Sequence, residues 1–245
     1  MIPYPFGIGA SCAVNQWYII DCNSSTPYLP ALNHLKVLGV NLENRTVTVR
    51  TPRITDCRNP VQDSSKIMGV DLGGSPFLFS NYNKFVFKGC GNAIMMMDNG
   101  SVVTACSTAC HGGVTHELND RDKCFGMGGC CETRVPYYFK SYSIHLSGLE
   151  EKGGACGSGF LADENHQENW FSVGQNTTSY DIPVSFLWTL TASDQITCCE
   201  NTRRVMVDMF NDTALYTWEC YNTWLPKVGN FYLTDGCKTK DDNGT

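Results

Sequence analysis

Strand-like alternation is clearest in the stretch Lys84-Phe85-Val86-Phe87-Lys88. Its period of two puts the phenylalanines on one face of a strand and the lysines, with Val86, on the other. Thr46-Val47-Thr48-Val49-Arg50 repeats the pattern, with the valines on one face. Similar short stretches recur between Gly, Pro, Asn and Ser, and helical periodicity is weak, confined to Leu187 to Ile196. We therefore predict a mainly β fold, with disulfide-rich β-sheet lobes and long loops.

Cysteine is frequent, with 14 among 245 residues. An even number spread over the whole chain predicts a disulfide framework formed in an oxidising compartment. The predicted disulfide cysteines are Cys12, Cys22, Cys57, Cys90, Cys106, Cys110, Cys124, Cys130, Cys131, Cys156, Cys198, Cys199, Cys220 and Cys237. Adjacent cysteines cannot bond to one another without strain, so each member of Cys130-Cys131 and Cys198-Cys199 should have a different partner.

Cysteine counts also suggest how the chain is divided. Residues 1–135 contain nine cysteines, residues 136–195 contain only Cys156, and residues 196–245 contain four. If the last four pair among themselves, Cys156 must bond to the first segment. We therefore predict three segments with these bounds, the first two tied by a disulfide.

Charge and glycosylation motifs favour an extracellular protein over a nucleic-acid-binding one. The formal net charge is −6, whereas nucleic-acid-binding domains are usually strongly basic. Residues 1–90 are locally positive, with eight Lys or Arg against five Asp or Glu. No apolar run could span a bilayer, so we expect membrane attachment only through a helix absent from this chain. Asn-x-Ser/Thr motifs predict glycosylation at Asn23, Asn44, Asn99, Asn176, Asn211 and Asn243.

A series of motifs resembles, in order, the extracellular region of plant wall-associated receptor kinases. Ile2-Pro3-Tyr4-Pro5-Phe6-Gly7-Ile8-Gly9, followed by Cys12 and Cys22, resembles the start of that family's galacturonan-binding domain. The later motifs are Asn83-Lys84-Phe85 with Gly89-Cys90, Cys106-x-x-x-Cys110, Cys124 to Cys130-Cys131-Glu132-Thr133, Gly154-Ala155-Cys156 with Gly159-Phe160-Leu161, Ile182-Pro183-Val184 with Trp188, and Gly229-Asn230-Phe231-Tyr232-Leu233 with Cys237. The resemblance covers nearly the whole chain.

This resemblance implies what each segment is. Residues 1–135 would form a galacturonan-binding-like domain and residues 136–195 a wall-associated C-terminal segment. Residues 196–245 would form a degenerate EGF-like module, because they have four cysteines instead of six. The chain would then be a ligand-binding ectodomain on the apoplastic side of the plasma membrane. We expect it to be non-catalytic and to need no cofactor, because the family's Ser/Thr kinase is cytoplasmic.

Two classes of partner follow from the resemblance. The implied ligand is de-esterified pectin, a polymer with one carboxylate per sugar, recognised in wall sensing or defence. The alternative is an ectodomain that recognises a pathogen protein, a peptide or a co-receptor, which the acidic net charge favours.

Binding pectin requires cations spaced along a surface. Arginine suits this role because its planar guanidinium takes a carboxylate bidentately. The candidates are Arg45, Arg50, Arg53, Arg58, Lys84 and Lys88. Alternation places Arg50 and both lysines on outward strand faces. One exposed ion pair contributes only about 0.2–1 kcal/mol, so several must act together on a repeating polymer. The alternative is that they are ordinary solvated strand charges.

We expect no metal or catalytic site. Cys106-x-x-x-Cys110-His111 has zinc-like spacing, but an oxidising compartment favours disulfides. No histidine stands in a Gly-x-Ser-x-Gly or His-Glu-x-x-His motif. Paired carboxylates of glycoside hydrolases are recognised by spatial separation, so the sequence leaves a secreted carbohydrate-active enzyme open. We interpret Glu150-Glu151 and Asp163-Glu164 as exposed loop charges and Trp188 as a core residue.

Overall fold

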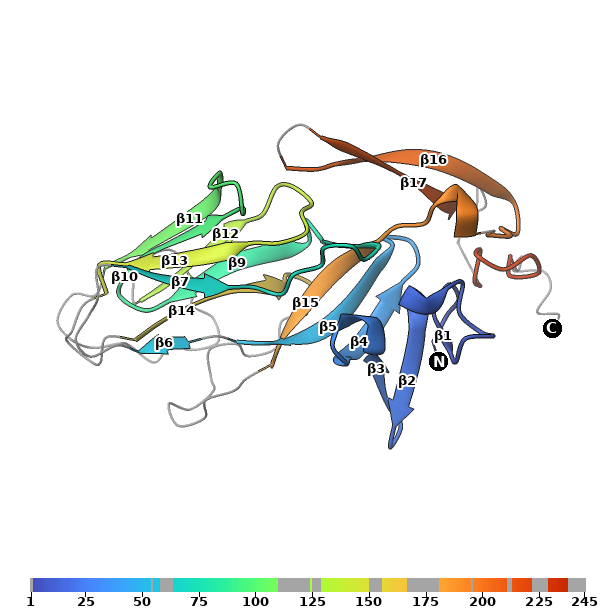
Figure 1. Cartoon of the computed structure of the whole chain (residues 1–245), viewed down its shortest axis with the longest axis horizontal. Helices are drawn as coiled ribbons and strands as arrows, with labels where there is room; N and C mark the ends of the chain where they lie inside the picture. The colour runs from blue at the N-terminus through green and yellow to red at the C-terminus, as the bar shows by residue number, and fades with distance from the viewer. Residues whose placement is uncertain are drawn as a thin grey trace, which may run out of the picture. The chain divides into compact units, whose positions relative to one another are not determined.

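Strands form nearly all the regular structure of the protein (Figure 1). The computed structural model describes residues 2–53, 55–57, 64–109, 124, 129–149, 156–166, 181–194, 196–210, 213–221 and 229–237. The helical elements among these residues are three short 3-10 helices, η1 (Gln16–Tyr18), η2 (Pro30–Leu32) and η3 (Ala192–Asp194). The predicted mainly β class is confirmed. No helix of the described residues is long and apolar enough to cross a membrane.

Hydrogen bonds join the strands into four sheets. The largest has the order β1 (Gly7–Ile8), β2 (Ile19–Asn23), β3 (Thr26–Leu29), β4 (Leu35–Asn41), β5 (Thr46–Pro52), β15 (Asp181–Trp188) and β8 (Phe77–Phe79). A second has the order β11 (Val102–Thr108), β10 (Gly91–Met96), β13 (Ser143–Ser147) and β7 (Ser64–Met68). A third has the order β12 (Cys130–Arg134), β9 (Asn83–Lys88), β14 (Cys156–Asp163) and β6 (Thr55–Cys57). The fourth is a hairpin of β16 (Asn201–Asp208) and β17 (Ala214–Tyr221).

The chain forms two compact units. Unit 1 contains residues 1–49, 74–78 and 186–245, and unit 2 contains residues 50–73 and 79–185. The chain passes between units within β5, β8 and β15, and at the turn before β8. This division differs from the contiguous segments predicted from cysteine counts, because strand pairing brings together stretches that are far apart in sequence.

Unit 2 is a β-sandwich in which β14 of one four-stranded sheet packs against β13 of the other. Phe85 and Phe87 of β9 are fully buried in the interior of the sandwich, as alternation requires. Glycines in β14 allow the sheets to approach closely. A Cβ at Gly159 would lie 2.8 Å from Ile144 Cγ2 and 3.4 Å from a ring carbon of Phe85. Any larger residue there would force the sheets apart.

The opposite face of β9 is covered too, which corrects the expectation that it faces outward. Val86 is 0 % exposed. It belongs to an apolar cluster with Cys124, Cys130, Phe160, Ala162 and Ile182. Lys84 and Lys88 flank this cluster and are half-buried. The run of three apolar residues between the two lysines therefore belongs to a strand that is covered on both faces.

Unit 1 is organised around aromatic rings from distant parts of the chain. Phe6 makes an edge contact with Tyr18, with ring centroids 5.0 Å apart. Trp188 makes an edge contact with Tyr232 at 5.1 Å. The Tyr18 hydroxyl donates to the Thr189 carbonyl at 2.5 Å. Trp188 is fully buried, so its predicted core position is confirmed.

Four disulfides confirm that adjacent cysteines have different partners. Cys130 bonds to Cys124 and Cys131 to Cys106. The last four cysteines pair among themselves, as Cys198–Cys220 and Cys199–Cys237. Cys90 is also disulfide-bonded.

The predicted bond from Cys156 to the first segment can be compared only with the backbone register. Register places Cys156 directly opposite Cys57, a cysteine of the first segment, in the β14–β6 pair. The side chains of these two cysteines, and all of Cys110, lie outside the described residues, so their disulfides remain predictions.

Cys12 and Cys22 depart from the predicted framework. Both are exposed free cysteines in this structure, so neither has a disulfide partner here. The prediction that every cysteine takes part in a disulfide is therefore wrong for these two. An even count does not ensure that each thiol has a neighbour within bonding distance.

Candidate functional site

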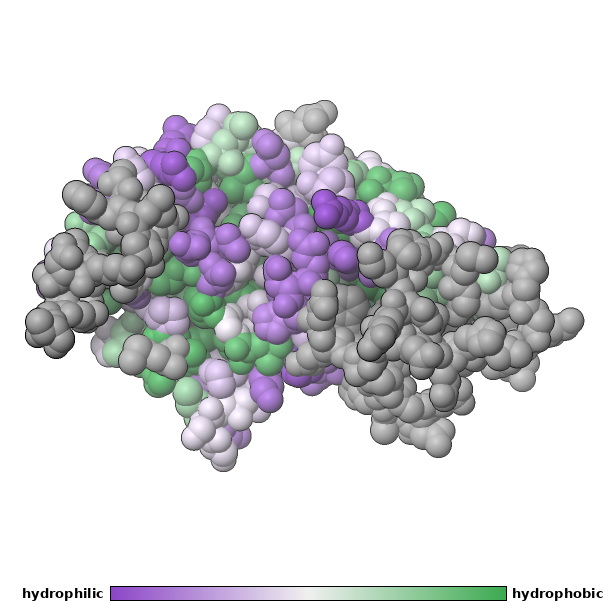
Figure 2. Space-filling view, turned by 180° about the vertical axis from the view of Figure 1, so that it is seen from behind, coloured by the Kyte–Doolittle hydropathy of each residue, from purple (hydrophilic) through white to green (hydrophobic). Residues whose placement is uncertain are grey.

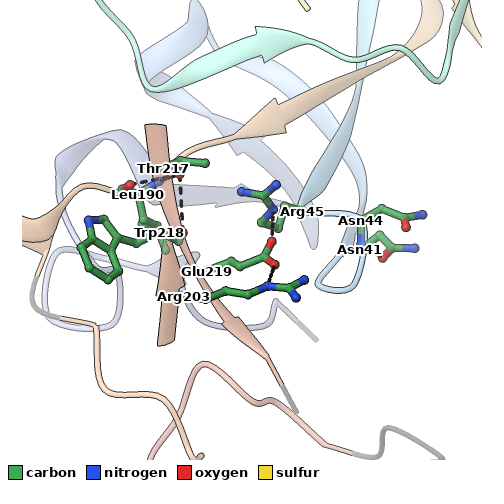
Figure 3. A network of polar contacts seen from close by, with 8 residues as sticks. All are labelled: Asn41, Asn44, Arg45, Leu190, Arg203, Thr217, Trp218 and Glu219. Atoms are coloured by element: carbon green, nitrogen blue, oxygen red, sulfur yellow. Dashed lines mark hydrogen bonds and ion pairs between the residues drawn. The ribbon is translucent and has the colours of Figure 1, made fainter. Parts of the chain in front are cut away.

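Arg45 forms an ion pair inside the protein. This corrects the prediction that Arg45 belongs to a cationic surface. Its Nε lies 2.9 Å from Glu219 Oε2, and the two side chains are only 13 % and 11 % exposed. Glu219 also accepts from Arg203 Nε at 2.5 Å (Figure 3). Arg45 has a φ of 52°, a conformation uncommon outside glycine, which marks a position fixed by its surroundings. Arg45 therefore stabilises unit 1 and does not present its charge to a ligand.

Arg50 and Lys84 are also engaged by the protein. Arg50 Nη1 donates to the carbonyl of Asp181 at 2.9 Å. Lys84 Nζ lies 3.0 Å from Glu132 Oε1, and both side chains are about a quarter exposed (27 % and 28 %). An ion pair of this exposure contributes about 0–1 kcal/mol, so an external carboxylate could compete with Glu132 for Lys84.

Arg53 and Lys88 are the two predicted cations that the structure brings together, and we call them the Arg53–Lys88 pair. Lys88 lies opposite Ser158 in the β9–β14 register. Arg53 donates to the Ser158 hydroxyl from both Nε, at 3.1 Å, and Nη2. Ser158 is 1 % exposed, so it fixes one side of the guanidinium. The guanidinium also lies over the Phe160 ring, 5.1 Å from its centroid.

Arg53 and Lys88 are two positive charges near each other, and both side chains are partly buried. Burial, followed by the positive charge of Arg53, lowers the pKa of Lys88 below its usual value. Each cause disfavours the ammonium form. A carboxylate bound beside both residues would offset the repulsion between Arg53 and Lys88, because its negative charge attracts both cations. The pair is therefore suited to bind one acidic group.

Sequence reasoning missed the residues that hold this pair in place. Ser158 and Phe160 come from β14, whose glycine-rich start was not predicted as a strand. In the sequence, Phe160 belongs to a family motif, which predicts no contact between Phe160 and Arg53. Arg58, the sixth predicted cation, lies outside the described residues.

Unit 1 has a hollow of about 440 Å³. Asp21, Cys22, Asn23, Tyr28 and His34 line it. Among the described residues, its lining has one carboxylate and no lysine or arginine, so it does not suit an acidic polymer.

The glycosylation motifs within the described residues are placed where a glycan could attach. Asn23, Asn44 and Asn99 are all exposed. Figure 3 shows the Asn44 amide pointing away from the Arg45 guanidinium, so a glycan there would not crowd the ion pair. Asn176, Asn211 and Asn243 lie outside the described residues.

One acidic residue differs from its predicted role. Asp163 is 2 % exposed rather than an exposed loop charge. Its carboxylate accepts from the Asn165 amide at 2.9 Å and lies 3.2 Å from His166 Nδ1. It therefore shapes the turn at the end of β14. Glu150-Glu151 lies outside the described residues.

The exposed surface mixes hydrophilic and hydrophobic residues (Figure 2). The large hydrophobic side chains exposed among the described residues are Ile8, Val102, Tyr137, Met206, Tyr216 and Leu233. Met206 and Tyr216 are direct cross-strand neighbours on the β16–β17 hairpin. They form the one place where two of these six side chains lie opposite each other in a sheet of the described residues.

Comparison with known proteins finds wall-associated receptor kinase-like proteins among the relatives of this chain. Wall-associated receptor kinase-like 1 of Arabidopsis thaliana is 28 % identical over 273 residues, covering 98 % of this chain and 37 % of that protein. The chain is related to the wall-associated receptor kinase-like proteins. Wall-associated receptor kinase-like 17, from the same plant, is 34 % identical over 205 residues, covering 76 % of this chain and 25 % of that protein.

The chain spans about a quarter to a third of the length of the curated relatives it matches. No family model matches it. No solved structure matches it significantly. The relatives are receptor kinases by name, and their similarity supports a receptor region for this chain.

Proposed function

We propose that this chain is the extracellular, apoplastic ligand-binding region of a wall-associated-type receptor kinase. It binds de-esterified pectin and supports signalling in wall sensing or defence. The chain itself is non-catalytic in this proposal, and a cytoplasmic Ser/Thr kinase outside it carries the signal. The relatives' names and the disulfide-linked β fold support the receptor assignment.

The Arg53–Lys88 pair is the observation that carries the choice of ligand. Two adjacent cations with a lowered lysine pKa favour an acidic group between them. The Phe160 ring and the Ser158 hydroxyl hold the guanidinium in place, which reduces the entropy lost on binding. Lys84 lies four residues along the same strand, about 13 Å away, and offers a second contact to a repeating polymer.

Calorimetric titration with oligogalacturonides tests this proposal. We expect Lys88→Gln to weaken binding about tenfold, since a hydrogen bond to a charged group contributes about 1.5–3 kcal/mol. Arg53→Gln should have a similar effect, and binding should weaken as salt rises. Lys36→Gln is the matched control, because Lys36 is an exposed strand lysine of unit 1. Unchanged affinity in the Arg53/Lys88 double variant, or equal affinity for methyl-esterified pectin, would contradict the proposal.

A protein or peptide ligand is the second candidate. The exposed Met206 and Tyr216 support it, because methionine and aromatic residues are enriched at protein interfaces. A ligand of this kind should bind with little dependence on salt and should be unaffected by substitutions at Arg53 and Lys88. The titrations above therefore distinguish the two candidates.

A further inference from the structure

Strand β16 has one side paired and one side available. It pairs with β17 along its whole length, from Asn201 opposite Tyr221 to Asp208 opposite Ala214. Among the described residues, no other strand pairs with it, and the hairpin forms its own sheet (Figure 1). An unpaired strand edge presents a row of backbone donors and acceptors to any extended chain.

The hydrogen bonds of the hairpin identify which residues face that edge. The amide of Trp218 donates to the Leu190 carbonyl at 2.9 Å, so even-numbered residues of β17 face away from β16. In an antiparallel pair, the backbone groups of two opposite residues either both face the partner strand or both face away from it. Trp218 lies opposite Arg204, so the backbone groups of Arg204 face away from β17. The amides and carbonyls of Arg204, Met206 and Asp208 therefore face the open edge.

The sequence of this edge is complementary to itself. It reads Arg204-Val205-Met206-Val207-Asp208, with opposite charges two residues to either side of Met206. An antiparallel copy centred on Met206 would place Arg204 of each strand opposite Asp208 of the other. The valines would likewise face valines, so every cross-strand pair would be favourable.

We propose that two copies of this chain associate edge to edge through β16, with the two-fold axis at Met206. The result is a four-stranded sheet in which the backbones of Arg204, Met206 and Asp208 exchange hydrogen bonds with the second copy. An isologous contact of this kind uses the same surface on both partners and closes as a dimer. The proposal is independent of the ligand bound at the Arg53–Lys88 pair.

Side chains on the outer face of the hairpin are suited to this contact. Met206 is 56 % exposed and Tyr216 52 % exposed. The Arg204 guanidinium lies 4.0 Å from the centroid of the Tyr216 ring, which restricts it before the second copy arrives. Edges that are protected against pairing carry charges that repel another copy, whereas between Arg204 and Asp208 this edge carries one charge of each sign.

Charge exchange tested by sedimentation velocity can establish or refute the dimer. The experiment uses the whole chain, with the exposed thiols of Cys12 and Cys22 alkylated so that disulfides between copies do not contribute. We expect a concentration-dependent monomer–dimer equilibrium. Arg204→Asp or Asp208→Arg should each weaken association about tenfold, because each creates two like-charge pairs by symmetry. The double variant Arg204→Asp/Asp208→Arg should restore it.

Two further variants complete the test. Lys36→Asp makes the same charge change as Arg204→Asp at an exposed strand position away from the hairpin, and it should leave association unchanged. Met206→Pro removes an amide that faces the edge and none that bonds to β17, so it should abolish the dimer while the hairpin remains. A chain that stays monomeric at all concentrations would overturn the proposal. So would a double variant that fails to recover association.

Discussion

Arg45 and Arg53 were equivalent candidates in the sequence, but they lie in opposite electrostatic environments. Arg45, in unit 1, faces the carboxylate of Glu219 and is 13 % exposed. Arg53, in unit 2, lies near a second cation, whose pKa it lowers. The first arginine lies beside a carboxylate, and the second lies beside a lysine.

If the proposed function holds, this difference separates a charge that stabilises the fold from a charge that binds the ligand. A cation paired inside the protein contributes to the stability of its unit and has little left to offer a ligand. Two like charges held together reduce stability slightly, and an acidic ligand can recover that cost on binding. The number of cations in a segment therefore says little about where an anion binds.

Removing the carboxylate from the unit 1 network should have the largest effect on stability. Glu219→Gln keeps the volume but leaves the Arg45 charge uncompensated at a mostly buried position. We expect unfolding to become about 3 kcal/mol easier in a urea titration followed by tryptophan fluorescence. The matched change is Glu132→Gln, which breaks the more exposed pair with Lys84 and should cost less than about 1 kcal/mol. Equal losses in the two variants would remove the distinction between the units.

Packing beneath the Arg53–Lys88 pair gives the next largest effect. Gly159 lies between Ser158 and Phe160, and an added Cβ would be 2.8 Å from Ile144 Cγ2. Gly159→Ala should destabilise the chain by about 1–3 kcal/mol and should also weaken polymer binding, because the partners of Arg53 shift. Gly39→Ala in β4 is the control, since nothing lies within 4 Å of its added Cβ. Its effect should be within about 0.5 kcal/mol by thermal unfolding.

The fold class could be predicted because local patterns determine it. β5 and β9 coincide closely with the stretches Thr46 to Arg50 and Lys84 to Lys88, which are predicted from their alternation. β14 was missed, because Gly157 and Gly159 are typical of loops in a sequence. Their role depends on the close approach of Ile144 and Leu146 from another strand, which no local window contains.

The site was harder to predict than the fold. Alternation correctly assigned Lys84 and Lys88 to the face opposite the phenylalanines. It could not reveal that this face is covered by Ile182, more than 90 positions later in the chain. The same holds for Arg45, whose partner Glu219 is brought near by tertiary packing alone. Exposure and pairing depend on long-range contacts, so residue type alone could not rank the six cations.

The pKa of Lys88 is the smallest effect and the most direct probe of the comparison. Burial and the Arg53 charge both lower it, so nuclear magnetic resonance titration of the lysine side chains should find Lys88 below the ordinary lysine value. The folded state then releases this proton at lower pH than the unfolded state. Stability should therefore rise slightly with pH between the two pKa values, as the unfavourable ammonium is lost.

Substitution and ligand should both move this pKa in the same direction. Arg53→Gln removes the repelling charge and should raise the pKa of Lys88 part of the way back, leaving the contribution of burial. An oligogalacturonide bound at the pair should raise it further, because its carboxylate favours the ammonium form. Arg45→Gln is the control and should leave the pKa of Lys88 unchanged, because Arg45 is no cause of its shift. If Arg53→Gln leaves the pKa of Lys88 unchanged, burial alone lowers that pKa. Arg53 and Lys88 would then not be electrostatically coupled, and the contrast with Arg45 would be lost.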